Sequence, residues 1–222
     1  MRFQRVFMVA LLTSVSCTSF NLDAHAFTET FTGNYTPSIE NRIFVSQDEK
    51  IQVGAKKFID TLAQDGIGFL SDDSLSEDQR KEKFREFLLR NFDMNAIGRF
   101  ALGRYWKTSS PQEQKEYLNL FEDMIVDIYS KRFSDYNGEA IIIESSRPEG
   151  KSDTIVTSSI VPASGQKIRV DWRIRYKKDQ YKVIDVMVEG VSMALTQRSD
   201  FASVIQRGGG KVEVLLAHLR MK

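Results

Sequence analysis

Apolar residues recur every three or four positions in the first half of the chain and at every second position through much of the second half. The first spacing is typical of amphipathic helices, and the second is typical of strands that are buried on one face. The helical spacing covers about residues 44–63, 76–91, 94–102 and 110–133. We expect Gly66 and Gly68 to end the first of these helices.

Two of the predicted helices begin at capping pairs. Ser76 is followed three residues later by Gln79, and Ser110 is followed by Pro111 and Glu113. The helix that Ser110 opens carries apolar residues around more of its circumference than the usual one-sided stripe. We therefore expect neighbours on two sides of this helix.

The alternating pattern predicts four strands, at about residues 140–144, 154–161, 168–176 and 181–188. The third is the clearest, because apolar residues from Ile168 to Tyr176 alternate with charged residues from Lys167 to Arg175. One face of the sheet is expected to be packed and the other to be wet. Turns are expected at residues 147–150, 162–165 and 177–180.

The last part of the chain returns to a mixed pattern. Glu189-Gly190 is expected to end the fourth strand, residues 191–207 to be partly helical, and the glycines at 208–210 to precede a last helix at 212–219. This order of elements predicts an α+β fold, in which helices wrap around a four-stranded antiparallel sheet.

The N-terminus has the pattern of a secretory signal peptide. Arg2 and Arg5 precede a short apolar run, and Ala24-His25-Ala26 forms a small-residue cleavage site. A lipoprotein signal that ends at Cys17 is an alternative, although the residues before Cys17 lack the usual leucine. A buried N-terminal helix is a second alternative.

The chain is therefore divided into a signal peptide (1–26), a flexible polar arm (27–43) and a single domain (44–222). We expect the mature protein to be exported to the periplasm. Cleavage takes away two of the 31 basic residues and one of the 30 acidic ones, so the mature chain carries no net charge. This balance argues against nucleic acid as a partner, because binding to phosphates needs a basic surplus. It also gives no reason to expect more than a monomer.

Residues 27–222 offer few groups for catalysis. They contain no cysteine, and their one histidine, His218, is expected to lie on a helix surface. A zinc or copper site would then depend on carboxylates alone, and the glycine-rich motifs that hold phosphates are missing. We expect no catalytic residue, no metal and no cofactor. A buried carboxylate with a raised pKa is the alternative, with Asp171, Asp185 and Glu189 as candidates.

Five arginines could bind an anionic head group or a protein partner. They are Arg99, Arg104, Arg169, Arg173 and Arg175. For the last three, alternation along the strand already explains their positions as the charged solvent face of a sheet.

Two long strings carry a family resemblance. FDMNAIGRFALGRYW at residues 92–106 and KVIDVMVEGVSMALTQRSDFASVIQR at residues 182–207 resemble the MlaC family, also known as toluene-tolerance proteins. SSPQEQKEYLNLFEDMI at 109–125 and VDWRIR at 170–175 are similar to that family's long helix and central strand. The resemblance covers roughly residues 45–220 in collinear order.

The resemblance implies more than the pattern does. It implies a curved sheet, wrapped by helices, that encloses an apolar pocket for acyl chains while the head group stays near solvent. Proteins of this kind carry phospholipid through the periplasm. Their partners are an outer-membrane lipoprotein–porin complex and an inner-membrane ABC transporter with an MCE-domain protein, and the system maintains outer-membrane lipid asymmetry. The phospholipid is cargo rather than a cofactor.

The apolar faces and the resemblance together place the expected lipid pocket between sheet and helices. Its floor is expected to consist of Ile168, Val170, Trp172 and Ile174. Its walls are expected to consist of Phe100, Tyr105, Phe121, Ile125, Val188, Val191 and Met193. Docking to the membrane complexes is assigned to Arg99, Arg104, Arg169 and Arg173.

Two other classes of protein stay open at this point. An exported isomerase or hydratase would have a smaller pocket with Asp171 or Asp185 pointing into it. A periplasmic chaperone or binding module would instead present an open groove and carry no diacyl lipid.

Overall fold

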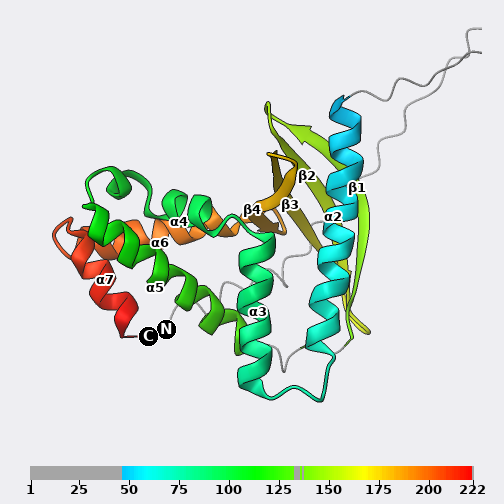
Figure 1. Cartoon of the computed structure of the whole chain (residues 1–222), viewed down its shortest axis with the longest axis horizontal. Coiled ribbons are helices and arrows are strands. Elements are labelled where there is room, and N and C mark those ends of the chain that lie inside the picture. The colour runs from blue at the N-terminus through cyan, green and yellow to red at the C-terminus, as the bar shows by residue number, and fades with distance from the viewer. Residues whose placement is uncertain (1–46, 133–135, 137, 222) are drawn as a thin grey trace, which may run out of the picture. The chain divides into compact units, whose positions relative to one another are not determined.

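The computed structural model describes residues 47–132, 136 and 138–221, so the expected signal peptide and arm lie outside the described residues. Helices come first, antiparallel strands follow, and two helices end the chain (Figure 1). This order confirms the α+β class. The elements are α2 (Gln47–Leu70), α3 (Glu77–Asn91), α4 (Met94–Leu102), the 3-10 helix η1 (Gly103–Lys107), α5 (Pro111–Ser130), β1 (Ala140–Glu149), β2 (Asp153–Val161), β3 (Ile168–Lys177), β4 (Gln180–Val188), β5 (Val191–Ser192), α6 (Met193–Arg207) and α7 (Val212–Arg220).

Both predicted capping pairs are formed. The Ser76 hydroxyl accepts a hydrogen bond from the Gln79 backbone N–H, and the Gln79 side chain accepts one from the Ser76 N–H. Ser110 and Glu113 make the same reciprocal pair, with Pro111 in the first turn of α5. The expected end of this helix near residue 133 is wrong by about one turn, because α5 ends at Ser130.

The prediction that Gly66 and Gly68 end the first helix is wrong. Helix α2 continues through both glycines to Leu70. Phe69, in its last turn, packs its ring against the rings of Phe84 and Phe87 on α3, at centroid distances of 6.3 and 5.6 Å. Contacts between two helices thus outweigh the weak helix propensity of glycine, which costs only about 1 kcal/mol per residue.

The strands form one antiparallel sheet in the order β1-β2-β3-β4-β5. The prediction of four strands is wrong by one, because Val191 and Ser192 form β5 beside Val188 and Met187. Glu189 and Gly190 both have positive φ angles, of 49° and 79°, as in the tight turns that join antiparallel strands. Glu189-Gly190 therefore reverses the chain instead of ending the sheet.

Strand β1 is longer than the sequence indicated. It was expected to end near residue 144 and to turn at 147–150, but pairing continues from Arg147 opposite Ile155 to Glu149 opposite Asp153. Pro148 lies within this stretch. Proline is tolerated there because β1 is the edge strand of the sheet, where one side of the backbone needs no hydrogen-bond partner.

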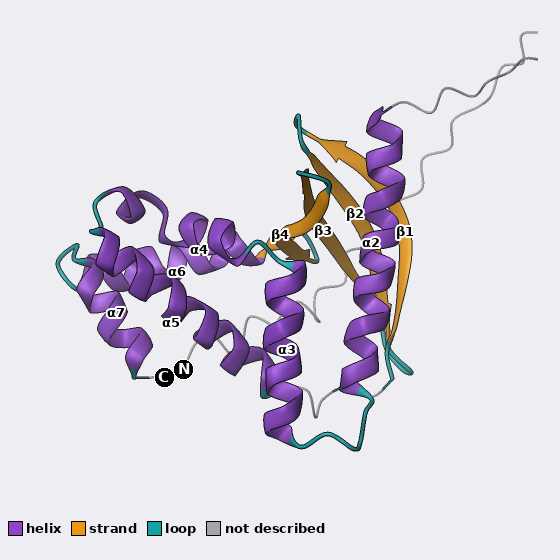
Figure 2. Cartoon of the chain, viewed as in Figure 1, coloured by secondary structure: helices purple, strands orange, loops and turns teal. Residues whose placement is uncertain are grey.

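The buried apolar residues form two clusters. The sheet cluster joins α2 and α3 to the sheet, and the helical cluster joins α4, α5, α6 and α7 (Figure 2). Helix α5 contributes Phe121 and Met124 to the helical cluster and Val126 to the sheet cluster, and Ile125 packs against both. The prediction that this helix has neighbours on two sides is confirmed.

Candidate functional site

One face of the sheet is apolar, and we call it the apolar face. Ile168, Val170, Trp172 and Ile174 alternate along β3. Register places Val156 of β2 beside Trp172 and Val188 of β4 beside Val170 on the same face. Ile174 and Val156 are fully covered in the sheet cluster by residues of α2 and α3. Ile168, Trp172 and Val188 are only half-buried, whereas Val170 between them is buried, so the apolar face is unevenly covered.

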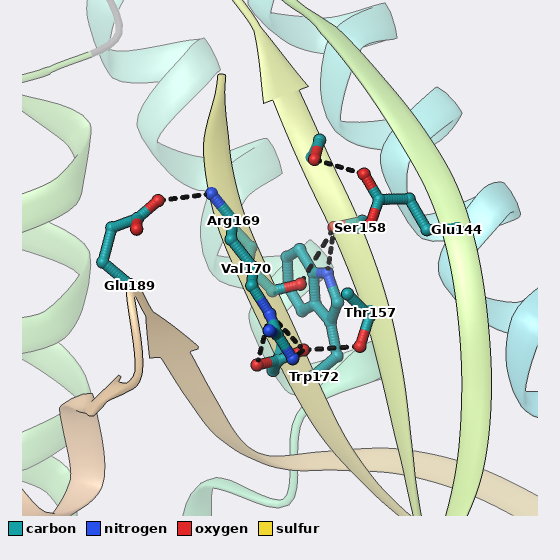
Figure 3. Close-up of polar contacts among 9 residues, drawn as sticks. Glu144, Thr157, Ser158, Arg169, Val170, Trp172 and Glu189 are labelled. Atoms are coloured by element: carbon teal, nitrogen blue, oxygen red, sulfur yellow. Dashed lines mark hydrogen bonds and ion pairs between the residues drawn. The ribbon is translucent and has the colours of Figure 1, made fainter. Parts of the chain in front are cut away.

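A polar side chain on the apolar face is satisfied within the sheet. Ser158 is fully buried, and its hydroxyl donates to the Val170 carbonyl oxygen at 3.2 Å (Figure 3). The indole N–H of Trp172 donates to the same hydroxyl oxygen at 2.9 Å. Because both polar groups are paired, the Trp172 ring presents an apolar surface without an unsatisfied N–H.

Three predicted wall residues lie with the helical cluster. Phe121 is fully buried there and packs against the rings of Tyr117 and Phe201, at centroid distances of 5.8 and 6.2 Å. Tyr105 and Ile125 are half-buried at the margin of the same cluster. Phe121 thus lies in a packed core, whereas Tyr105 and Ile125 keep part of their surface accessible.

The remaining wall residues are more open. Phe100 and Val191 expose 40% and 49% of their surface, and Met193 is half-buried at the start of α6. Phe, Val and Met are among the residues that are most often buried, although single exposed ones are common. The predicted lining residues therefore lie in three environments, which are the packed core, its half-buried margins, and the exposed surface of α4 and β5.

The opposite face of the sheet, the polar face, is organised around a buried carboxylate. Asp153 exposes 6% of its surface and accepts hydrogen bonds from Arg173 Nε at 2.9 Å and Arg175 Nε at 2.8 Å. Arg173 and Arg175 also lie opposite Ile155 and Asp153 in the strand register, so their aliphatic stems cover this part of the sheet. This face was predicted to be exposed to solvent, but the side chains of Arg173 and Arg175 cover part of it.

A second network on the polar face joins β2, β3 and the turn before β5. The Thr157 hydroxyl donates to Asp171 Oδ1 at 2.6 Å, and Arg169 pairs with the same carboxylate (Figure 3). The backbone N–H of Arg169 donates to Glu189 Oε1 at 2.6 Å. Asp185 accepts from the Ser192 hydroxyl at 2.6 Å and fixes the start of α6. Asp171 and Asp185 thus have their partners on the polar face. An isomerase-like site would require one of these carboxylates to point toward the apolar face, and neither does.

Arg99 and Arg104 lie on α4 and η1, and both are exposed. The guanidinium of Arg99 lies 5.1 Å from the centre of the Trp106 ring, and that of Arg104 lies 4.9 Å from the centre of the Tyr105 ring. Within the described residues neither arginine has an acidic partner. They differ in this respect from Arg169 and Arg173.

Two of the surface hollows among the described residues bear on the site. One of 380 Å³ is bordered by Arg175, Lys177, Lys178 and Lys182 together with Asp93. The other, of 250 Å³, lies between η1 and α6, and Tyr105 is the predicted wall residue that borders it. Over residues 47–132, 136 and 138–221 there is no cluster of metal-binding side chains and no helix long and apolar enough to cross a membrane.

Comparison with known proteins identifies the family. A family model described as MlaC protein matches residues 60–221, which extend from the middle of α2 to the end of α7. The chain belongs to the MlaC family. The resemblance carried by the strings at 92–106 and 182–207 is thereby confirmed.

Two curated relatives support the assignment to MlaC. The intermembrane phospholipid transport system binding protein MlaC of Haemophilus influenzae is 26% identical over 129 residues, which cover 56% of this chain and 60% of that protein. The toluene tolerance protein ttg2D of Pseudomonas putida is 19% identical over 110 residues, which cover 50% of this chain and 51% of that protein. The matched region thus spans somewhat more than half the length of these relatives.

A solved structure shares the MlaC fold of this chain. The phospholipid-binding protein of Ralstonia solanacearum, determined in complex with a phospholipid, has a TM-score of 0.67 and 20% sequence identity to this chain. The similarity covers 75% of this chain and 95% of the other.

Sequence reasoning missed two relations in this MlaC-family chain. Asp153 stands 20 and 22 residues from Arg173 and Arg175, so no local spacing indicates that they meet. Gly103 lies in one of the strings that carry the resemblance, yet its close approach to Arg198 depends on the packing of α4 and η1 against α6. Neither relation could be found without the strand register or the helix packing.

Proposed function

We propose that this protein is a periplasmic phospholipid carrier without catalytic activity. It takes up phospholipid at one membrane complex and delivers it to another, and so maintains the lipid asymmetry of the outer membrane. The observation that carries the proposal is that the MlaC match includes nearly all described elements, and that its relatives are named for phospholipid binding and transport.

The physical requirement for a carrier follows from the cargo. A diacyl lipid has on the order of 30 methylenes, and exposing each to water costs about 0.8 kcal/mol. Free passage through an aqueous compartment is therefore disfavoured by roughly 20 kcal/mol or more. A protein that covers the acyl chains removes this barrier without breaking a covalent bond, so no catalytic group is needed.

We place the acyl chains against the less covered part of the apolar face. Ile168, Trp172 and Val188 supply half-buried apolar surface there, and the paired indole N–H of Trp172 leaves no polar group to repel a lipid. Ile125, which packs against both the helical cluster and the sheet cluster, forms the opposite wall. Val170 and Ile174 are the buried members of the same face, and Phe121 belongs to the packed helical cluster, so these three residues support the pocket without exposed surface of their own.

The partners proposed for the carrier are a phospholipid, the MCE-domain protein of an inner-membrane ABC transporter, and an outer-membrane lipoprotein–porin complex. Arg99, Arg104, Arg169 and Arg173 are the proposed docking residues. Direction of transport must then come from different affinities at the two complexes or from ATP used by the transporter, because a binding protein by itself only equilibrates its cargo.

Native mass spectrometry of the protein purified from the periplasm, followed by solvent extraction, tests the carrier function. We expect a mass excess of one or two phospholipids that is released on denaturation. A clean apo mass that does not change after incubation with phospholipid vesicles would remove the carrier hypothesis.

A matched pair of isoleucines tests the location of the pocket. Ile168 lies on the apolar face, whereas Ile142 pairs with Ser159 on the polar face and is 48% exposed. Ile168→Glu is expected to lower the bound lipid at least tenfold, because a carboxylate in an apolar site costs several kcal/mol. Ile142→Glu is expected to keep its lipid. Equal lipid content in the two folded variants would show that the acyl chains lie elsewhere.

A further inference from the structure

The 250 Å³ hollow between η1 and α6 has a chemistry of its own, and we call it the arginine hollow. Arg104, Tyr105, Arg198 and Gln206 border it. Gly103 has a φ angle of +62°, and a Cβ at this position would lie 2.9 Å from Arg198 Nε. The left-handed backbone conformation favours glycine, and the missing side chain leaves room for the Arg198 guanidinium.

The two arginines of the hollow have no counter-charge among the residues that the structure describes. No acidic residue of this part of the chain borders the hollow, and neither Arg104 nor Arg198 forms an ion pair within it. This contrasts with Arg173 and Arg175 on the polar face, which share the carboxylate of Asp153. Two guanidinium groups around one hollow without an acid are suited to an anion.

Both guanidinium groups lie close to aromatic rings. Arg198 lies 5.1 Å from the centre of the Phe100 ring, and Arg104 lies 4.9 Å from that of Tyr105 and donates to the Tyr105 hydroxyl at 2.9 Å. A guanidinium that lies close to an aromatic ring is attracted by it and still has further N–H groups that can donate to the oxygens of a phosphate.

Exposed apolar residues adjoin the hollow. Phe100, whose ring centre lies 5.1 Å from Arg198, exposes 40% of its surface, and Leu195, one turn before Arg198 on α6, exposes 57%. The hollow thus combines arginines and a tyrosine with exposed Phe and Leu side chains nearby. Proteins place this combination of residues at the boundary between lipid head groups and acyl chains. A soluble anion would use the arginines but would leave Phe100 and Leu195 without a role.

We propose that the arginine hollow binds the phosphate of an anionic phospholipid in a bilayer surface, while Phe100 and Leu195 enter the outer part of the acyl layer. This contact is separate from the lipid carried as cargo, and it goes beyond the proposed function because membrane binding requires no carrier activity. It would bring the protein to the membrane before any protein complex is engaged. Anionic surfaces attract each basic side chain by about 1 kcal/mol, so two arginines give a modest, reversible attachment.

Vesicle co-sedimentation of the full mature chain tests the proposal. Vesicles containing phosphatidylglycerol are expected to bind the protein, and vesicles of phosphatidylcholine alone to bind it much more weakly. The double variant Arg104→Gln/Arg198→Gln is expected to lower binding to the anionic vesicles roughly 30-fold. The matched control is Lys57→Gln/Lys115→Gln, which removes the same charge from exposed positions on α2 and α5 and should bind as the unchanged protein does.

Further variants distinguish a specific arginine site from general charge attraction. They also distinguish membrane binding from binding of the cargo lipid. Arg104→Lys/Arg198→Lys keeps the charge but loses the planar fork, so it is expected to bind less well than the unchanged protein. Leu195→Gln is expected to weaken binding without changing the fold. An equal loss in the lysine control, full binding by the Arg-to-Lys variant, or tight binding of inorganic phosphate without vesicle binding would overturn the proposal. Loss of co-purified lipid from the Arg-to-Gln variant would instead assign these arginines to the cargo head group, whereas the carrier function would stand.

Discussion

Replacement of Asp153 by asparagine is the sharpest test of how the sheet is held together. Asp153 receives hydrogen bonds from Arg173 and Arg175, and its side chain is only 4% exposed, whereas those of the two arginines are 40% and 39% exposed. The substitution Asp153→Asn keeps the shape of the side chain and one acceptor oxygen. It removes the charge that the two guanidinium groups share.

The magnitude follows from the unequal burial of the partners. An exposed ion pair contributes about 0–1 kcal/mol, and removing one partner of a fully buried pair costs about 3–5 kcal/mol. Here the group that is removed is buried, but the two that stay behind can still be solvated. We therefore expect Asp153→Asn to lower the free energy of unfolding by about 2 kcal/mol at pH 7.

The pH dependence of this loss has a definite sign. Burial by itself raises the pKa of Asp153, but the hydrogen bonds and charges of Arg175 and Arg173 outweigh burial and hold the pKa below its ordinary value. Because the folded-state pKa is lower than the unfolded-state pKa, the stabilisation is present above about pH 4 and is lost as the pH falls through the folded-state value. The free energies of unfolding of the unchanged protein and Asp153→Asn should therefore differ by the whole amount at pH 7 and by less below about pH 4.

Urea unfolding followed by circular dichroism at pH 7 and at several values below about pH 4 measures both effects. Glu149→Gln is the matched control, because Glu149 lies opposite Asp153 in the register and pairs with Arg147 where both side chains are exposed. That variant is expected to change stability by less than about 0.5 kcal/mol. If the two variants lose the same stability, or if the loss in Asp153→Asn does not shrink in acid, the carboxylate does not organise the polar face.

Other substitutions test the helices. Gly54→Ala is expected to destabilise the protein by about 1–3 kcal/mol, because its Cβ would lie 2.0 Å from the Tyr181 hydroxyl oxygen. In the same helix, a Cβ at Gly68 would meet no atom within 4 Å, so Gly68→Ala should stabilise the protein by about 0.5–1 kcal/mol. Equal urea midpoints for Gly54→Ala and Gly68→Ala would contradict the packing of α2 on β4. Ser110→Ala breaks the reciprocal cap with Glu113 and should cost about 1 kcal/mol in the same assay. An unchanged midpoint would mean that the cap does not stabilise α5.

Local chemistry made part of this fold predictable. The caps at Ser76 and Ser110 depend on residues three positions apart, and they appear as expected. The alternation that identified β3 likewise depends on its own residues. The class α+β follows from such signals, because the pattern of each element is contained within a few residues.

Relations between distant segments were not predictable in the same way. The ring of Phe69 packs the last turn of α2 against α3. The helix therefore continues past Gly66 and Gly68, where the sequence had predicted its end. The positive φ angles of Glu189 and Gly190 turn a break into a hairpin with β5. For the candidate site, alternation identified the face of Trp172 but not how far neighbouring helices cover it, since coverage depends on helix packing rather than on strand pattern.

Four arginines named in the two proposals divide into two groups, and the division bears on the proposed docking. Arg169 and Arg173 are already paired with buried carboxylates, so a partner that used them would have to compete with Asp171 and Asp153. Reversing their charge would also place like charges near those acids and destabilise the sheet, so a loss of partner binding there would be hard to separate from a loss of structure. Arg104 and Arg198 have no such carboxylate partner within the described residues. Their contacts there are with aromatic rings. At Arg104 of η1 and Arg198 of α6 the proposed docking would break no ion pair of the described residues, whereas at Arg169 and Arg173 it would compete with one.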